Sequence, residues 1–228
     1  MRSPLAWIVL FDSNVEAVQG EARSRALRAG SRLGARTRWA GGILDRSVHH
    51  FAMRSLPDSG RRGRPDIVHA SILSIADAPA YADGIVNFLV HTVEDKVIVP
   101  AASWRPPRNY RNFLGLMEEL LRIGRVPPKG RPILRLEKGS IEDAVRRTRA
   151  DRIVLLSSSG KLRDLSEVVA EMRHRVPAYL IGGYARGGPR QEVTKLADEV
   201  VSIHSSSLSS SIVISRLLYE VEKLTGQP

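Results

Sequence analysis

The stretch AYLIGGYARGG, residues 178–188, joins a short apolar run to a loop of small residues, and this combination decides the fold. Similar apolar runs precede and follow it in the last third of the chain, and helical patterns separate them. We expect strands at residues 133–136, 152–156, 178–181 and 199–203. Strands that alternate with helices form a parallel sheet with helices on its faces, so the sequence predicts an α/β fold.

Small residues follow three of these expected strands, in the segments Ser157–Gly160, Gly182–Gly188 and Ser205–Ser207. Ligands of open α/β sheets bind beyond the carboxyl ends of the strands, so the three segments predict a cofactor pocket at one edge of the sheet. A dinucleotide is not the expected cofactor, because the pattern G-G-x-x-x-G-G departs from G-x-G-x-x-G and occurs late in the chain. The sequence also lacks a P-loop lysine motif.

The rest of the chain carries a mixture of strand and helix patterns. An apolar run predicts a first strand at residues 6–11, and residues 12–14 (Asp-Ser-Asn) predict the cap of a helix that begins near Val15. The final helix, expected at residues 208–224, is apolar over so much of its circumference that it should also face a partner subunit or a tightly wrapped chain. The remaining expected elements are a helix at 46–56, a polar turn at 58–64, a buried strand at 67–75, a β-hairpin from 87–91 and 96–100, a helix at 109–122 and a linker at 126–131.

The composition limits the function classes. The 228 residues carry 35 Lys and Arg against 24 Asp and Glu, a formal charge of +11, and 29 of these cations are Arg. Arg binds phosphate through two nitrogens and stacks on bases, so the excess favours a nucleic-acid partner, although a GC-rich genome or a hot habitat would also enrich Arg. The Arg-rich segment 21–38 is interpreted as a solvated basic surface or a mobile basic loop.

Several other classes are excluded by the residues that the chain lacks. The absence of Cys removes disulfides, iron–sulfur clusters and a Cys nucleophile, and it favours a cytoplasmic location. The longest apolar stretch, Leu5–Phe11, is too short to span a membrane. Six scattered His without an H-E-x-x-H pattern predict no metal site. Ser206, His204 and Asp198 could be drawn as a hydrolase triad, but no G-x-S-x-G motif accompanies them.

Two segments carry the pattern of a nucleic-acid site. In RGRPDIVH, residues 62–69, a turn enters an expected strand, and Asp66 lies near enough to Arg64 to orient its guanidinium. In RPPRNYR, residues 105–111, prolines stiffen a loop in which cations alternate with Tyr110. Cations beside an aromatic ring suit phosphate contact and base stacking, so this loop favours RNA.

Five separated segments together resemble one family: RGRPDIVH at 62–69, D-x-P at 77–79, PRNYRNFLGLMEELL at 107–121, IGGYARG at 181–187 and VSIHSSSLSSSIV at 201–213. In this order they resemble the small-subunit ribosomal RNA pseudouridine methyltransferases of the SPOUT superfamily, in their archaeal form. The resemblance implies a SPOUT-type α/β knot, with a C-terminal trefoil knot and a small β-hairpin extension. It also implies one domain over residues 1–228 with an insertion around 76–110, a homodimer, and S-adenosylmethionine as the methyl donor.

The resemblance also implies roles for individual residues. Arg64 would act at the reacting base, with Asp66 holding it. The expected RNA contacts are Arg64, Arg105, Arg108 and Arg111. The expected cofactor contacts are Gly182, Gly187, Ile203, His204, Ser205, Ser206, Ser207 and Leu208.

This sequence departs from the family pattern at two places. A family arginine falls at Asn112, one residue after Arg111. The family pattern D-S-P-x-N reads Asp-Ala-Pro-Ala-Tyr at residues 77–81, so the amide of that pattern is absent.

The implied function is transfer of a methyl group to ring nitrogen 1 of a pseudouridine in small-subunit ribosomal RNA, during small-subunit biogenesis. Two alternatives stay open at this point. The first is a non-catalytic ribosome-assembly factor with the same RNA surface, and the second is a SPOUT methyltransferase of transfer RNA.

Overall fold

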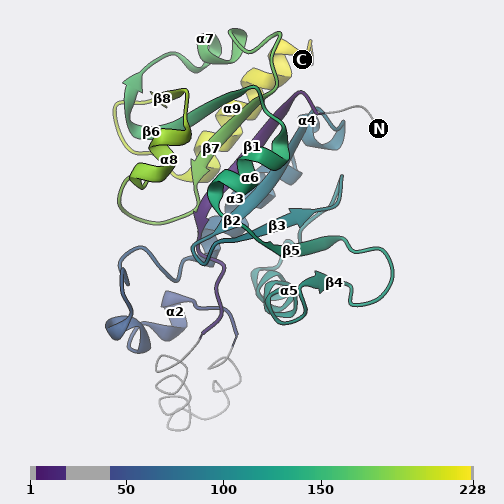
Figure 1. Ribbon diagram of the computed structural model, residues 1–228, viewed down its shortest axis with the longest axis vertical. Helices are drawn as coiled ribbons and strands as arrows, with labels where there is room; N and C mark the ends of the chain where they lie inside the picture. The colour runs from purple at the N-terminus through teal and green to yellow at the C-terminus, as the bar shows by residue number, and fades with distance from the viewer. Residues whose placement is uncertain (1–3, 19–41, 227–228) are drawn as a thin grey trace.

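In a computed structural model, the structure describes residues 4–18 and 42–226, and these form one sheet flanked by helices (Figure 1). The Arg-rich segment 21–38 lies outside the described residues. The sheet has eight strands in the order β4-β5-β3-β2-β1-β7-β6-β8. The strand bounds are β1 Ala6–Ser13, β2 Val86–Thr92, β3 Lys96–Pro100, β4 Arg125–Val126, β5 Leu134–Lys138, β6 Arg152–Leu162, β7 Pro177–Gly182 and β8 Glu199–Ser202.

The sheet is parallel in one half and antiparallel in the other. Strands β2, β1, β7, β6 and β8 run parallel to one another, which confirms the parallel α/β core. The expected hairpin is confirmed, since β2 pairs with β3 in antiparallel fashion. The expected strand at 133–136 exists as β5, but it pairs antiparallel with β3 and lies outside the parallel core. The trefoil knot, the single-domain boundaries and the insertion at 76–110 stay predictions.

Alternate residues of β1 divide the core into two layers. Ile8 and Leu10 face the layer that is covered by α3, α4, α5, α7 and α9. Val9 and Phe11 face the opposite layer, which is covered by α6 and α8. This period of two is the signature of a strand that is buried on both faces. The helix bounds are α3 Pro65–Ala76, α4 Pro79–Ala82, α5 Tyr110–Ile123, α6 Ile141–Thr148, α7 Leu165–Ala170, α8 Gln191–Leu196 and α9 Ser210–Leu224.

The apolar segment at 67–75 forms helix α3, so the expectation of a buried strand was wrong. Pro65 occupies the first turn, where its missing N–H costs no hydrogen bond. Val68, Ile72 and Ile75 are buried at intervals of four and three, which places them on one helical face. A short apolar run fits a buried helix as well as a buried strand, which explains the error.

The helix expected from Val15 was also wrong, because the chain continues after β1 without helical structure through Val18. Ala17 instead makes an antiparallel bridge with Ile43. Residues 12–14 are buried at the end of β1 and bond to other elements instead of capping a helix. The expected helix at 46–56 is replaced by α2, Arg46–His49, and a short 3-10 helix, Ala52–Ser55.

Helices α5 and α9 confirm two further predictions. The side chain of Asn109 accepts hydrogen bonds from two N–H groups in the first turn of α5, and α5 then runs to Ile123. Helix α9 begins two residues later than expected and buries Ile214, Leu217, Leu218 and Val221. Among the described residues, no helix has the length and apolar character needed to cross a membrane.

Candidate functional site

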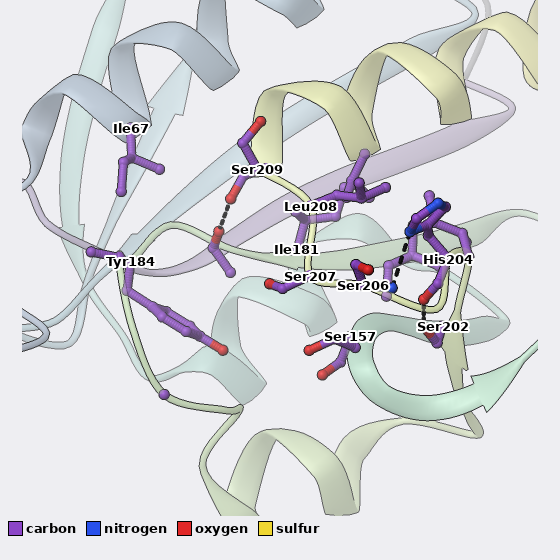
Figure 2. A pocket seen from close by; sticks show the side chains of 18 of the residues that line it. Ile67, Ser157, Ile181, Tyr184, Ser202, His204, Ser206, Ser207, Leu208 and Ser209 are labelled. Carbon is purple, nitrogen blue, oxygen red and sulfur yellow. Dashed lines mark hydrogen bonds between the residues drawn. The ribbon is translucent and has the colours of Figure 1, made fainter.

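A cavity of about 410 Å³ lies beside the middle of β6 and the ends of β7 and β8, next to the first turns of α3 and α9. All three predicted small-residue segments contribute to its wall: Ser157 and Ser158 from the first, Tyr184 and Ala185 from the second, and Ser206 from the third. Figure 2 shows Tyr184 at one end of the cavity and His204 at the other, with Ser207 between them. The expected loop at 157–160 was wrong, because Ser157 and Ser158 lie within β6, which continues to Leu162 with a shift in its pairing to β8 between Leu156 and Lys161. The parallel strand order brings this part of β6 together with two loops that are far from it in the sequence.

Most of the predicted cofactor contacts line this cavity: Gly182, Gly187, Ile203, His204, Ser206, Ser207 and Leu208. Ser205 is exposed and is not part of the lining. Its neighbours are fixed in place, because the N–H of Ser206 donates to His204 Nδ1 at 3.0 Å and Ser202 Oγ donates to the His204 carbonyl at 2.8 Å (Figure 2).

The lining also includes side chains that were not predicted as cofactor contacts. Tyr184, Ser157 and Ser158 belong to segments already identified as pocket loops, so the signal for them was present. Ile67 and Val213 come from the first turns of α3 and α9. No local signal could identify these two, since their place at the cavity depends on how α3 and α9 pack against the sheet.

The loop after β7 lies against the end of β1 with almost no space between them. The N–H of Gly183 donates to the Phe11 carbonyl at 2.8 Å, and the Gly183 carbonyl accepts from the N–H of Asn14 at 3.3 Å. A Cβ atom at Gly183 would lie 2.2 Å from Ser13 Oγ and 2.9 Å from Ser13 Cα. Only glycine fits such a close approach of two backbones. On the other side, Ser210 Oγ of α9 donates to the Gly182 carbonyl at 2.5 Å.

Arg61 contacts the loop after β7 at Tyr184 and Gly188. Its guanidinium donates to the Gly188 carbonyl at 2.8 Å and lies 4.0 Å from the centre of the Tyr184 ring. It also pairs with the carboxylate of Asp12 at 3.3 Å. The Asp12 side chain is only 3% exposed. Arg61 therefore connects a wall of the cavity to a buried charge at the end of β1.

Arg64 and Asp66 form the pair that was predicted, at the entrance to α3 instead of a strand. Arg64 donates through Nε and Nη2 to the two Asp66 carboxylate oxygens, each at 2.8 Å. Partial burial favours a higher pKa for the Asp66 carboxyl, but the hydrogen bonds and the charge of Arg64 outweigh it and lower that pKa. The Arg64 N–H donates to Asn14 Oδ1 at 3.2 Å, and Arg64 also lines the cavity. The Arg64 guanidinium, paired with the Asp66 carboxylate, thus faces the same space as the three small-residue segments.

The other predicted RNA contacts lie away from the cavity, beside α3 and α5. Arg108 is exposed and donates to both carboxylate oxygens of Asp77, which follows the last turn of α3. Arg64 lies at the opposite end of this 12-residue helix, which is about 18 Å long at 1.5 Å per residue. Arg105 and Arg111 are also exposed on this side. The loop that carries them is held by His69 of α3, whose Nε2 lies 2.8 Å from the Pro107 carbonyl.

Across residues 4–18 and 42–226, no group of three or more His, Asp or Glu side chains has the arrangement of a metal site. Asp198, drawn above as part of a hydrolase triad, accepts from the N–H of Ile153 at 2.7 Å and so supports the start of β6.

Comparisons with known proteins agree with the fold. The model of the EMG1/NEP1 methyltransferase family matches residues 8–222. Ribosomal RNA small subunit methyltransferase Nep1 from Staphylothermus marinus is 33% identical, over 98% of this chain and 97% of that protein. The same enzyme from Thermococcus kodakarensis is 35% identical, over 81% of this chain and 82% of that protein. Archaeoglobus fulgidus Nep1, solved bound to S-adenosylhomocysteine, superposes with a TM-score of 0.81 at 30% identity and covers 97% of this chain and 99% of that one.

Proposed function

Because the chain belongs to the EMG1/NEP1 methyltransferase family, we propose that it methylates ring nitrogen 1 of a pseudouridine in small-subunit ribosomal RNA. As a member of this family it is an S-adenosylmethionine-dependent ribosomal RNA methyltransferase. The choice of base and the roles of individual residues belong to the proposal. The observation that supports them best is the cavity that joins the serines of β6 and the loops after β7 and β8 to the Arg64–Asp66 pair.

The residues around the cavity fit S-adenosylmethionine. Its volume of about 410 Å³ is in the range of small-molecule pockets, which is roughly 300–1,000 Å³. Apolar side chains such as Leu208 and Ile181 suit the adenine ring, and the hydroxyls of Ser157, Ser206 and Ser207 suit the polar groups of the cofactor. We propose the predicted cofactor contacts that line the cavity, from Gly182 to Leu208, as its binding residues.

The chemistry explains why pseudouridine is the proposed base. Ring nitrogen 1 of pseudouridine carries a proton, whereas in uridine that nitrogen holds the glycosidic bond. When S-adenosylmethionine is bound, it supplies a methyl group on a sulfonium centre. Nitrogen 1 gives its proton to solvent water and forms the bond to the methyl carbon as the bond from that carbon to sulfur breaks. Arg64 stabilises the negative charge that develops on the base, and Asp66 keeps the guanidinium in position. Orientation of the base and the methyl donor within the pocket supplies much of the acceleration.

Arg105, Arg108 and Arg111 are proposed as contacts to the RNA backbone. They lie on the α3–α5 side, away from the cavity, and their exposure leaves them accessible to a large substrate. A single base would be extruded from a loop and inserted beside Arg64, at a cost of a few kcal/mol. An RNA that reaches both places must contact the surface along α3.

A homodimer is part of the proposal, with α9 in the interface. The side chains of Ile212 and Tyr219 are 46% and 59% exposed, although both are large and apolar. They are seven residues apart and so share one stripe of the helix. Contact with a second copy would remove this stripe from water, and replacing Tyr219 with Glu should then shift the protein to a monomer in sedimentation analysis. We also propose a cytoplasmic location, which the absence of Cys favours.

The decisive experiment offers labelled S-adenosylmethionine together with matched RNA hairpins that differ only in uridine or pseudouridine at one position. Transfer to the pseudouridine hairpin alone is expected. Transfer to both hairpins would refute the proposed base, and transfer to neither, despite cofactor binding, would favour an assembly factor. A transfer RNA carrying pseudouridine serves as the control for the other alternative, and it should remain unlabelled.

A further inference from the structure

A hollow on the face of the sheet opposite the cofactor cavity combines an apolar floor with a basic rim. It has a volume of about 680 Å³. Its floor is formed by Trp7, Leu89 and Val99 of three neighbouring strands. Its rim carries five cations from β5, α6 and the segments that follow them: Arg135, Lys138, Arg146, Arg147 and Arg149. Helix α6, in front of the sheet in Figure 1, forms one side of it.

The positive charge of this rim is only partly neutralised. Glu137 pairs with both Arg135 and Arg147, and Asp143 pairs with Arg146 at 3.1 Å. Within the described part of the chain, the side chains of Lys138 and Arg149 have no ion-pair partner. Five cations thus face two carboxylates, and the rim keeps positive charge that an anionic ligand would neutralise.

The floor supplies a second feature that a phosphate site alone would not need. Trp7 is partly exposed, and it packs on the core layer that contains Val9 and Phe11. An indole ring fixed by such packing is a platform for a nucleic-acid base, because every base can stack on it without a sequence requirement. Arginines around the ring match the phosphates on either side of a stacked base.

We propose that this hollow binds a single-stranded segment of RNA, with a base on Trp7 and phosphates on Lys138, Arg149 and the neighbouring arginines. A duplex does not fit this description, since its bases are already stacked on one another. This inference rests on the proposed function in one respect: the bound segment is taken to belong to the same ribosomal RNA that is methylated. The hollow then extends the RNA contact surface from the α3 side to the opposite face of the sheet.

The test measures binding of a single-stranded oligouridylate to the full chain by fluorescence anisotropy over a range of salt concentrations. Replacing both Lys138 and Arg149 with Ala should weaken binding and reduce the slope of log affinity against log salt by about 1.4, at about 0.7 for each phosphate contact of a single strand. Arg173→Ala, which removes an exposed cation beyond α7 on the other side of the sheet, should leave both affinity and slope near the wild-type values. An unchanged slope in the double variant would overturn the proposal.

Two variants of Trp7 test the stacking. Trp7→Leu should weaken binding at least about fivefold, as expected for loss of a stacked base. Trp7→Phe keeps an aromatic platform, so it should bind with near wild-type affinity while the quenching of tryptophan emission by the oligonucleotide is reduced. Equal binding by Trp7→Leu and wild type, at equal thermal stability, would exclude a base on the floor.

A final pair of measurements separates this proposal from the methylation reaction. The double variant should bind S-adenosylhomocysteine like the wild type and should still methylate a short pseudouridine hairpin. If no hairpin is methylated by any variant, the proposed function fails while oligonucleotide binding still tests the hollow. Displacement of the oligonucleotide by polyuridylate but not by polyglutamate is expected, and stronger displacement by polyglutamate would identify an acidic protein as the occupant.

Discussion

The contact between Gly183 and Ser13 allows a sharp test of how the cofactor loop is held. In Gly183→Ala the new methyl group would lie 2.2 Å from Ser13 Oγ, where no real Cβ can remain. Ser13 cannot move away easily, because it is fully buried and its Oγ donates to the Leu10 carbonyl at 3.1 Å. The loop therefore has to shift, which weakens the hydrogen bonds that Gly183 makes with Phe11 and Asn14.

The expected cost follows from these contacts. Overpacking typically costs about 1–3 kcal/mol, and one lost hydrogen bond adds about 1 kcal/mol. The free energy of unfolding should thus fall by about 2–4 kcal/mol, since the two effects occur together. If about 1.4–2.8 kcal/mol of this is lost from cofactor binding, the affinity for S-adenosylhomocysteine falls ten- to about a hundredfold.

Calorimetric titration with S-adenosylhomocysteine, together with a thermal melt, measures both effects. Gly188→Ala is the matched control, because a Cβ there meets nothing within 4 Å and the residue lies in the same loop. Combining Gly183→Ala with Ser13→Gly should recover part of the affinity, as the double variant removes Ser13 Cβ and Oγ. If Gly183→Ala binds and melts like Gly188→Ala, the close approach does not hold the loop and the reasoning is refuted.

Three further predictions concern charged side chains. Arg61→Ala should weaken S-adenosylhomocysteine binding about five- to thirtyfold, because it removes the contacts with Tyr184 and Gly188. Arg61→Lys should restore only part of the affinity. Equal affinities of Arg61→Ala and the wild type in calorimetric titration would contradict this role. Asp66→Asn should lower kcat without weakening cofactor binding. Because the pairing with Arg64 lowers the pKa of Asp66, the stability that this pair contributes should be present at neutral pH and lost only as the pH falls below about 4. Thermal melts of the wild type and of Asp66→Asn across pH check this. Burial lowers the pKa of His91 from its ordinary value of 6.5, so below pH 6.5 the unfolded chain takes up a proton at His91 that the native protein does not. The melting temperature should therefore fall as the pH is lowered through that range. The fall should be less steep in His91→Gln.

The pocket loops after β7 and β8 were predictable from the sequence because their composition answers a local requirement. Gly182 and Gly183 lie where the chain passes close to Tyr184 and Ser13, and the serines at 206–207 form a tight segment at the end of β8. Small residues after an apolar run are visible without a structure. The Arg64–Asp66 pair was equally visible, since two residues of separation are enough to bring its atoms to 2.8 Å.

Helix α3 and the end of β1 were misjudged for a common reason. The apolar residues of α3 are buried beneath other elements, so the segment lacks the polar face that marks a surface helix. Residues 12–14 have the side chains of a helix cap, but burial turns them to other partners: Asp12 pairs with Arg61, and Asn14 accepts from the N–H of Arg64. Local propensity is a weak guide where tertiary contacts satisfy the same polar groups.

The sequence by itself determined the α/β class, the pocket loops after β7 and β8, the Arg64–Asp66 pair and the basic, proline-stiffened segment at 105–111, because each depends on neighbouring residues. The tertiary structure alone decided that Ser157–Gly160 lies within β6 and meets these two loops, since this depends on β7 lying between β1 and β6 with β8 beyond. It also decided that Arg64 faces the cofactor cavity while Arg108 lies at the other end of α3. Distances between residues far apart in the chain follow from the order of the strands and the packing of the helices, and neither is present in any short stretch of sequence.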